Sequence, residues 1–262
     1  MREELRELYK YRELLYMIAY RDIKVRYKQS IMGFLWAILM PILIVMAGIV
    51  VRYGYAMAAH LPLQMDDVAS VAVKSLPWAF LVSSIRFGCN SLTVSNRDLV
   101  TKIYFPKEII PLASVVSSLF DFVIASAALA AFLALIHIRL SLSLLWVPVL
   151  MLALIALASG ISLVVAAGSL FFRDVKYIVE VLLTFGIFFT PVFYNVRMFG
   201  DKGKWLLLNP VAPLLEGLSA SVMRQPPPGF LWLGYSIGFA IVSLIGGYVC
   251  FKHLEPAFAE SI

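Results

Sequence analysis

The stretch NRDLVTKIYFPKE, from Asn96 to Glu108, decides how the rest of the chain is interpreted. It separates two long apolar segments. It carries three basic residues, Arg97, Lys102 and Lys107. Ser95, three residues before Asp98, can form a capping box that satisfies free N–H groups at the start of a helix. Pro106 then ends that helix, because proline has no N–H and clashes with the preceding turn. We therefore predict a short, charged, amphipathic helix between two membrane spans.

The apolar residues of this helix need a cover outside the bilayer. They are Leu99, Ile103, Tyr104 and Phe105. An ordinary solvated loop is the alternative interpretation. Because a capped helix with an apolar face is unfavourable in water, we predict that these side chains contact a partner protein.

The composition indicates a polytopic helical membrane protein. Of 262 residues, 61% are hydrophobic and 15% charged, whereas soluble domains carry about 25% charged residues. The mean hydropathy is +0.88. Cys89 and Cys250 lie in apolar runs, which indicates buried thiols rather than a disulfide or a metal pair. The net charge of +6 does not require a nucleic-acid partner, because its distribution fits membrane topology.

Six segments with few charges predict six membrane spans, each long enough for a hydrocarbon core of about 30 Å. They are 31–51, 76–95, 111–136, 146–170, 177–194 and a stretch between 224 and 252. Pro41 predicts a kink in the first span, and Thr190-Pro191 ends the fifth. Before the first span, residues 2–20 have the pattern of an amphipathic helix on the membrane surface. A soluble helix packed on a partner would show the same pattern.

Lysine and arginine set the orientation, because they are retained in the cytoplasm. The first 30 residues hold eight of them. With both termini inside, the inner side has roughly twice as many as the outer side. Residues 1–30 then form a cytoplasmic interface helix and basic segment, and residues 31–262 form the six-helix transmembrane domain. The loop 96–108 faces the cytoplasm, and the connection 52–75, with Lys74, lies outside.

The segment 196–229 lies outside in this topology although much of it is apolar. Pro210 and Pro213 stand where helices begin. We predict two short helices that dip into the outer leaflet or cover a pore mouth, since polar backbone at membrane depth needs protein or water around it. A disordered outer loop is the alternative.

No catalytic constellation appears in the sequence. There is no phosphate-binding G-x-x-x-x-G-K-[ST] motif, and the three histidines are far apart. We therefore predict no catalytic role and no metal site for this chain. A membrane transferase would need an acidic or histidine cluster. A channel or secondary transporter would show repeats or several intramembrane charges. Gly234 and Gly238 form a G-x-x-x-G pair that permits close helix approach in the last span.

Two opposite charges fall within predicted spans at nearly the same depth. Arg86 lies roughly 13 Å from the inner end of the second span, and Asp121 roughly 15 Å from that of the third. Glu180 lies near the edge of the fifth span. Because an unpaired arginine at mid-bilayer costs at least about 2.5–3.5 kcal/mol, we predict an Arg86–Asp121 ion pair. The alternative is that Arg86 faces the channel and attracts an anionic pyrophosphate or sugar acid.

Six stretches in order along the chain carry a family resemblance. They are RDIKVRYKQS (21–30), GFLW (33–36) running to Pro41, LVTKIYFPKE (99–108), FRDV (172–175), TPV (190–192), and NP through EG (209–217). In these stretches the chain resembles the permease subunits of ATP-binding-cassette exporters for O-antigen, teichoic acid and related surface polysaccharides. At Arg86 it departs from the pattern, since the family usually has a small or polar residue there.

The resemblance implies a homodimer in the bacterial inner membrane that acts in lipopolysaccharide biosynthesis. Two copies of a separate ATPase would bind ATP and Mg, so this chain would need no cofactor. The substrate would be a lipid-linked polysaccharide; the alternative is a permease of the same type for a lipid or drug. Segment 196–229 would be an outer gate. The resemblance also implies contact with the ATPase through Arg21, Asp22, Arg97, Asp98, Lys102, Tyr104, Phe105, Lys107 and Glu108.

A polysaccharide needs a wide channel, and sugar rings pack their C–H faces on aromatic rings. Our candidates for the channel lining are Phe34, Trp36, Arg86, Phe185, Phe188, Phe189 and Tyr194. Aromatic residues are also common in spans and at membrane interfaces. Tyr194 in particular fits the outer interface equally well.

Overall fold

The computed structural model describes residues 9–28, 33, 35–58, 65–95, 105–135, 142–223 and 225–258, and contains no strand among them. The α-helices are α2 (Arg12–Lys28), α3 (Leu35–Ala58), α4 (Met65–Asn90), α6 (Ile109–Leu135), α7 (Trp146–Phe171), α8 (Val175–Phe189), α9 (Val211–Met223) and α10 (Phe230–Leu254). The short elements are a π-helical turn η1 (Ser91–Ser95) and the 3-10 helices η2 (Leu142–Leu145), η3 (Val196–Leu208) and η4 (Glu255–Ala257).

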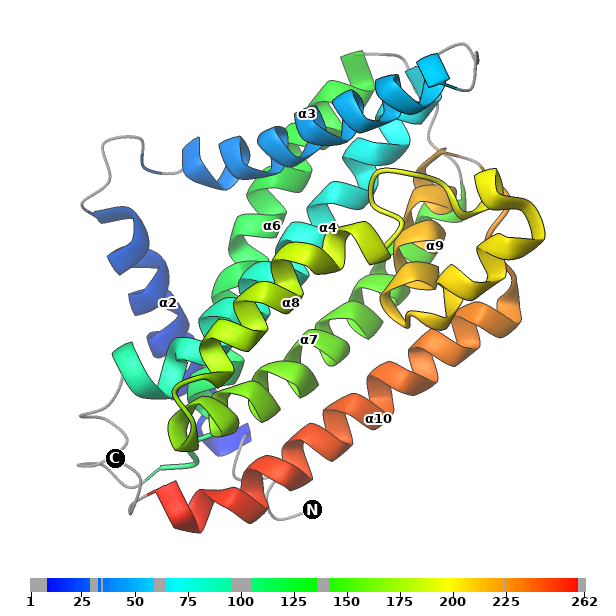
Figure 1. The fold of residues 1–262 in the computed structure, drawn as a ribbon. Helices are drawn as coiled ribbons and strands as arrows, with labels where there is room; N and C mark the ends of the chain where they lie inside the picture. The colour runs from blue at the N-terminus through cyan, green and yellow to red at the C-terminus, as the bar shows by residue number, and fades with distance from the viewer. Residues whose placement is uncertain are drawn as a thin grey trace.

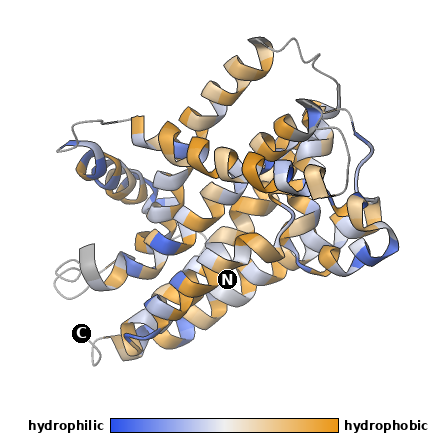
Figure 2. Ribbon diagram, turned by 45° about the horizontal axis from the view of Figure 1, so that its top comes forward, coloured by the Kyte–Doolittle hydropathy of each residue, from blue (hydrophilic) through white to orange (hydrophobic). Residues whose placement is uncertain are grey.

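Each predicted span contains a helix. Within the described residues, five helices are long and apolar enough to cross a membrane: α3, α4, α6, α7 and α10. Hydrophobic residues cover most of their lengths (Figure 2). The helix in the fifth predicted span, α8, has 15 residues and rises only about 22 Å. It ends as the sequence predicts, because Thr190 is extended, with φ −116° and ψ 135°, and Pro191 follows.

The centre of the bundle is formed by α4 and α7. Their best membrane-spanning windows are 78% and 61% buried, against 17–22% for α3, α6 and α10. Figure 1 shows α4, α7, α8 and α10 running in similar directions, with α3 crossing over α4 and α6. Most of the surface of α3, α6 and α10 is therefore left for lipid or another subunit.

A close crossing joins α7 to α10. A Cβ atom on Gly160 would lie 2.3 Å from the backbone oxygen of Ser243, and one on Gly247 would lie 2.3 Å from the oxygen of Gly160. Gly234 and Gly238 make no close approach within this chain, since no atom lies within 4 Å of a Cβ built at either position. The small residues of α10 that contact Gly160 of α7 are instead Ser243 and Gly247, which lie further along α10.

The two ends of the bundle differ in composition. At one end, which we call the α2 end, a buried cluster joins α2, η1, the start of α6 and the ends of α7 and α10. Its members include Ile18, Leu92, Phe105, Ile110, Leu163 and Phe251. At the other end, the α9 end, η3 and α9 pack against the beginnings of α4 and α10 (Figure 1). The N-terminal helix and residues 105–108 therefore lie at the same end as the C-terminal end of α10.

Some boundaries differ from the prediction. The N-terminal helix was predicted over residues 2–20, but the described helix α2 runs to Lys28 and includes the basic segment. It is held because Ile18 and Ala19 are buried in the α2-end cluster. In the second span, α4 begins at Met65 rather than at residue 76, so Lys74 lies in the helix and not in a loop. The helix predicted after Asn96 falls on residues 96–104, outside the described part of the chain.

The two short helices predicted within residues 196–229 are confirmed as ordered elements. Residues 196–208 form η3, and α9 begins directly after Pro210, with Pro213 in its first turn. Every residue of α9 from Val211 to Ser221 is buried. The apolar composition of this segment is therefore explained by packing against the bundle.

Candidate functional site

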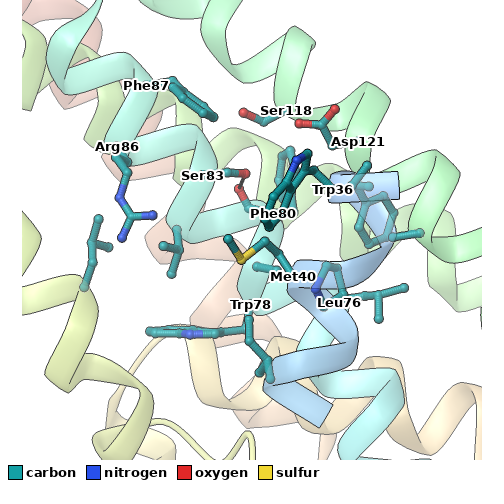
Figure 3. A pocket seen from close by; sticks show the side chains of 18 of the residues that line it. Trp36, Met40, Leu76, Trp78, Phe80, Ser83, Arg86, Phe87, Ser118 and Asp121 are labelled. Carbon is teal, nitrogen blue, oxygen red and sulfur yellow. Dashed lines mark hydrogen bonds between the residues drawn. The ribbon is translucent and has the colours of Figure 1, made fainter. Parts of the chain in front are cut away.

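A cavity of about 490 Å³ lies between α3, α4, α6 and α8, beside the end of α2 (Figure 3). Aromatic side chains form much of its wall: Tyr27, Trp36, Trp78, Phe80, Phe87 and Phe122. Its polar groups are Arg26, Ser83, Arg86, Ser118, Asp121 and Thr184. Flat apolar walls with a few polar groups suit an amphipathic ligand.

At one side of this cavity, Asp121 of α6 binds two residues of α2. Its carboxylate forms an ion pair with Arg26 and accepts a hydrogen bond of 2.5 Å from the Tyr27 hydroxyl. Burial, assisted by the bond to Asp121, raises the pKa of Tyr27, so the phenol stays protonated and donates. Arg26 also donates to Ser117 Oγ at 3.3 Å and lies 4.0 Å over the Phe87 ring. These contacts anchor the end of α2 to the membrane domain.

At the other side, Arg86 of α4 binds Glu180 of α8. Its Nε and Nη2 atoms donate to the two carboxylate oxygens at 2.9 and 2.6 Å, a bidentate geometry. The predicted Arg86–Asp121 pair is therefore wrong. Figure 3 shows Arg86 and Asp121 on opposite sides of the cavity, with Ser83, Phe80 and Trp36 between them. Depth along a helix gave the level of each charge but not the side of the helix on which it lies.

A double-mutant cycle should separate the two pairings. We expect Arg86→Leu and Glu180→Leu to couple by about 0.5–3 kcal/mol, the range for residues in contact. Arg86→Leu and Asp121→Asn should be additive within about 0.5 kcal/mol, because the two groups have different partners. Thermal unfolding of the purified protein measures both cycles. Coupling between Arg86 and Asp121 alone would contradict the observed pairing.

A second cavity, also about 490 Å³, opens beside the first at the α2 end. It is lined by Arg21, Asp22, Val25, Asn90, Ser91, Ser114 and Ser117, together with Arg26 and Phe87. Because Arg26 and Phe87 line both cavities, their stacked pair separates the two. Arg21 and Asp22 bind each other at 2.7 Å, and both line this second cavity.

The predicted ATPase contacts fall partly in the described residues. Arg97, Asp98, Lys102 and Tyr104 lie outside them. Phe105 is 6% exposed and packs into the α2-end cluster, which leaves little of its ring for a partner.

Glu108 is also buried, and it contacts the end of α10. Its carboxylate lies 2.9 Å from Lys252 Nζ, which also bonds Glu255 at 2.9 Å. The Lys107 N–H donates to Glu255 Oε1 at 3.4 Å, and its ammonium lies 5.6 Å from the Phe258 ring centre. Burial raises the pKa of the Glu108 carboxyl, and Lys252 opposes that rise. The C-terminal residues of the 96–108 segment, Lys107 and Glu108, are thus bound to the end of α10.

The predicted channel residues are not all brought together. Trp36 and Arg86 line the first cavity. Phe185, Phe188 and Phe189 are exposed on α8 and do not line it. Tyr194 donates its hydroxyl to Phe188 O at 3.0 Å and packs edge-on against Phe199. Phe34 lies outside the described residues.

Sequence reasoning missed a buried polar cluster at the α9 end. Lys74 is fully buried, and its ammonium donates to Tyr194 O at 2.6 Å and Asn195 Oδ1 at 2.7 Å. It also forms an ion pair of 3.3 Å with Glu216 of α9. A signal was present, because Glu216 is the one acidic residue in the apolar stretch 211–223 and so requires a partner.

Asn209 joins α8 to α9. Its amide donates to Thr190 Oγ1 at 2.9 Å, and its carbonyl oxygen accepts from the Val211 N–H at 3.0 Å. The second bond satisfies a donor at the start of α9, and the first holds the end of α8. One side chain therefore connects the end of α8 to the start of α9.

Comparison with known proteins places this arrangement in a family. Residues 13–223 match the model of the ABC-2 type transporter family. The chain is 30% identical over 255 residues to the O-antigen export system permease protein RfbA of Klebsiella pneumoniae, covering 95% of this chain and 94% of that protein. It is also 30% identical over 268 aligned positions to RfbA of Myxococcus xanthus, covering 98% of each. The helical bundle, its cavities and the buried α9 are thus those of a membrane-spanning transport protein that belongs to the ABC-2 type transporter family.

Proposed function

We propose that this chain is the channel-forming subunit of an ATP-driven exporter that moves lipid-linked polysaccharide of the O-antigen type across the bacterial cytoplasmic membrane. The observation that carries the proposal is the similarity to O-antigen export permeases along almost the whole of both chains. It extends over the membrane helices and over α9 at the outer end.

The energy for this transport comes from a separate ATPase. The sequence has no phosphate-binding loop. ATP and Mg are therefore bound by the partner, and this chain requires no cofactor. The excess of lysine and arginine on one side supports a cytoplasmic position for both termini. The ATPase then contacts the α2 end through the 96–104 segment and the neighbouring α2.

A second copy of the chain completes the channel. A cavity of about 490 Å³ has the size of a small-molecule site, whereas a polymer needs a continuous path. On α8, Phe185, Phe188 and Phe189 present exposed rings. In a homodimer such rings from two subunits supply a lining on which sugars slide between weak sites.

The same cavity supports one alternative substrate class. Its wall is mainly apolar and aromatic, which also suits a lipid or a drug-like amphiphile. A permease of the same type for such a molecule would need no polymer channel. The substrate specificity of the reconstituted complex distinguishes the two.

The test is copurification and transport. The chain is coexpressed with a candidate ATPase subunit of an ATP-binding-cassette exporter. The complex is reconstituted in proteoliposomes, and movement of a lipid-linked glycan is compared with that of the lipid carrier alone. We expect ATP-dependent export of the glycan, and none when the ATPase carries a substituted phosphate-binding lysine. Equal transport of carrier and glycan would favour the alternative. Failure of any ATPase to copurify would contradict the proposal.

A further inference from the structure

The cluster around Lys74 holds three segments of the chain together at the α9 end. Lys74 belongs to α4, Tyr194 and Asn195 to the connection after α8, and Glu216 to α9. Glu216 Oε1 also accepts from the Val196 N–H at 3.2 Å. We call Lys74, Asn195 and Glu216 the α9 latch.

Burying the two charges of the α9 latch carries a desolvation cost. Lys74 is fully buried and Glu216 is 9% exposed, so each charge has lost its water. Buried charges persist only when they are paired and hydrogen-bonded, and a well-packed apolar substitute often holds a fold equally well. Directional bonds differ from apolar packing because they specify one relative position of the joined segments.

The helix that carries Lys74 reaches both ends of the bundle. After Lys74, α4 continues to Asn90 and passes into the π-helical turn η1, which ends at Ser95. The segment 96–104 follows directly. Two further bonds fasten the same helix to α7: Ser162 Oγ donates to Ser84 O at 3.1 Å, and Ser169 Oγ donates to Cys89 O at 2.5 Å. A displacement applied at η1 therefore acts on the same helix that carries Lys74, with Pro77 between the two.

We propose that Lys74 is a positioning residue that ties α9 to α4, so that a displacement begun at the α2 end moves α9 at the opposite end. Packed helices move as rigid bodies with discrete arrangements, and a directional buried pair transmits such a movement without slippage. This inference rests on the proposed function, in which the segment containing α9 closes the outer mouth of the channel.

The test uses the complex with its ATPase in nanodiscs, where both faces are accessible. Cys89 and Cys250 are replaced by alanine, and Ser221→Cys places a reporter in α9, where Ser221 is 7% exposed. The rate of maleimide labelling is measured with and without ATP. ATP hydrolysis is measured in the same preparation, and export is measured in proteoliposomes.

In the protein with the α9 latch intact, ATP turnover should raise the labelling rate of the cysteine at position 221. Lys74→Met should label about tenfold faster without ATP, lose the response to ATP and lose at least about tenfold in export, while ATP hydrolysis continues. Because Lys74→Met strands the Glu216 carboxylate, the double variant Lys74→Met/Glu216→Gln removes both charges and preserves an acceptor for Val196. It should fold and show the same uncoupling. Lys204→Met, from an exposed pair with Asp201 in η3, is the matched control and should behave as the unchanged protein.

Each outcome decides the proposal. Normal ATP-dependent labelling and export in the folded double variant would overturn it. So would labelling of the cysteine at position 221 that does not respond to ATP when the α9 latch is intact. Absence of ATP-dependent export in the unchanged complex would contradict the proposed function instead. Retained hydrolysis with lost gating distinguishes positioning from a general loss of stability.

Discussion

Replacing Gly160 with alanine is expected to prevent α7 and α10 from packing and to remove most of the folded protein. The added Cβ would lie 2.3 Å from the oxygen and 2.4 Å from the carbonyl carbon of Ser243, and backbone atoms cannot rotate away as a side-chain end can. Overpacking in a core costs about 1–3 kcal/mol even when only side chains must move. The recovered monodisperse fraction and the thermal unfolding midpoint in detergent measure the effect.

Gly238→Ala in α10, the helix that packs against α7 at Gly160, is the matched control. A Cβ there meets no atom within 4 Å, so only the helix propensity changes. Alanine is favoured over glycine within a helix by about 0.5–1 kcal/mol, so this variant should be as stable as the unchanged protein or slightly more stable. Equal behaviour of the Gly160 and Gly238 variants would show that the crossing of α7 and α10 is not as tight as described.

The second large effect is expected from Lys252→Met. This change leaves the Glu108 carboxylate, which is 1% exposed, without its cation. Removing one partner of a buried pair costs about 3–5 kcal/mol. We expect a loss of that order at pH 7.5, with the α2-end cluster opening first, because Glu108 stands beside Phe105 and Ile109 in the chain.

This loss should shrink as the pH falls. Burial raises the pKa of Glu108, so the folded state binds a proton more readily than the unfolded chain, and stability falls as the pH rises through the folded pKa. Without Lys252 the pKa rises further, and mild acid neutralises the stranded carboxylate. Unfolding midpoints of the unchanged and Lys252→Met proteins should therefore converge between pH 7.5 and pH 5. A pH-independent difference would mean that Glu108 is not the group responsible, and Lys204→Met should show no difference at either pH.

The helices could be predicted from the sequence because charge is excluded from the bilayer core. Arg86 and Asp121 were placed correctly within spans, and both line one cavity. Their pairing was predicted wrongly because hydropathy carries no information on which neighbour faces each side of a helix. Asp121 binds Arg26, a residue 95 positions earlier that the sequence placed only in a general basic segment.

Lys74 was predicted to lie in a loop outside the membrane spans, but it lies within α4. A lysine near the end of an apolar run predicts a loop, since desolvating an ammonium group is unfavourable. In the structure the carbonyl of Tyr194 and the side chains of Asn195 and Glu216 replace the water, so the helix extends past it. Those partners lie more than 100 residues away in the chain, and no local pattern specifies them. The same limit applies to Gly160 and Gly247, whose contact depends on the crossing of two helices.

The shortness of α8 has a consequence for the surrounding lipid. Its 15 residues rise about 22 Å, roughly 8 Å less than a typical hydrocarbon thickness of about 30 Å. Lipids beside a short hydrophobic segment compress their acyl chains to match it, at a cost of a fraction of a kcal/mol per Å. We therefore expect the bilayer to be thinner where α8 meets lipid than beside the longer helices. A polar headgroup crossing there meets a lower barrier than elsewhere in the membrane, so acyl-chain length becomes a determinant of the turnover rate.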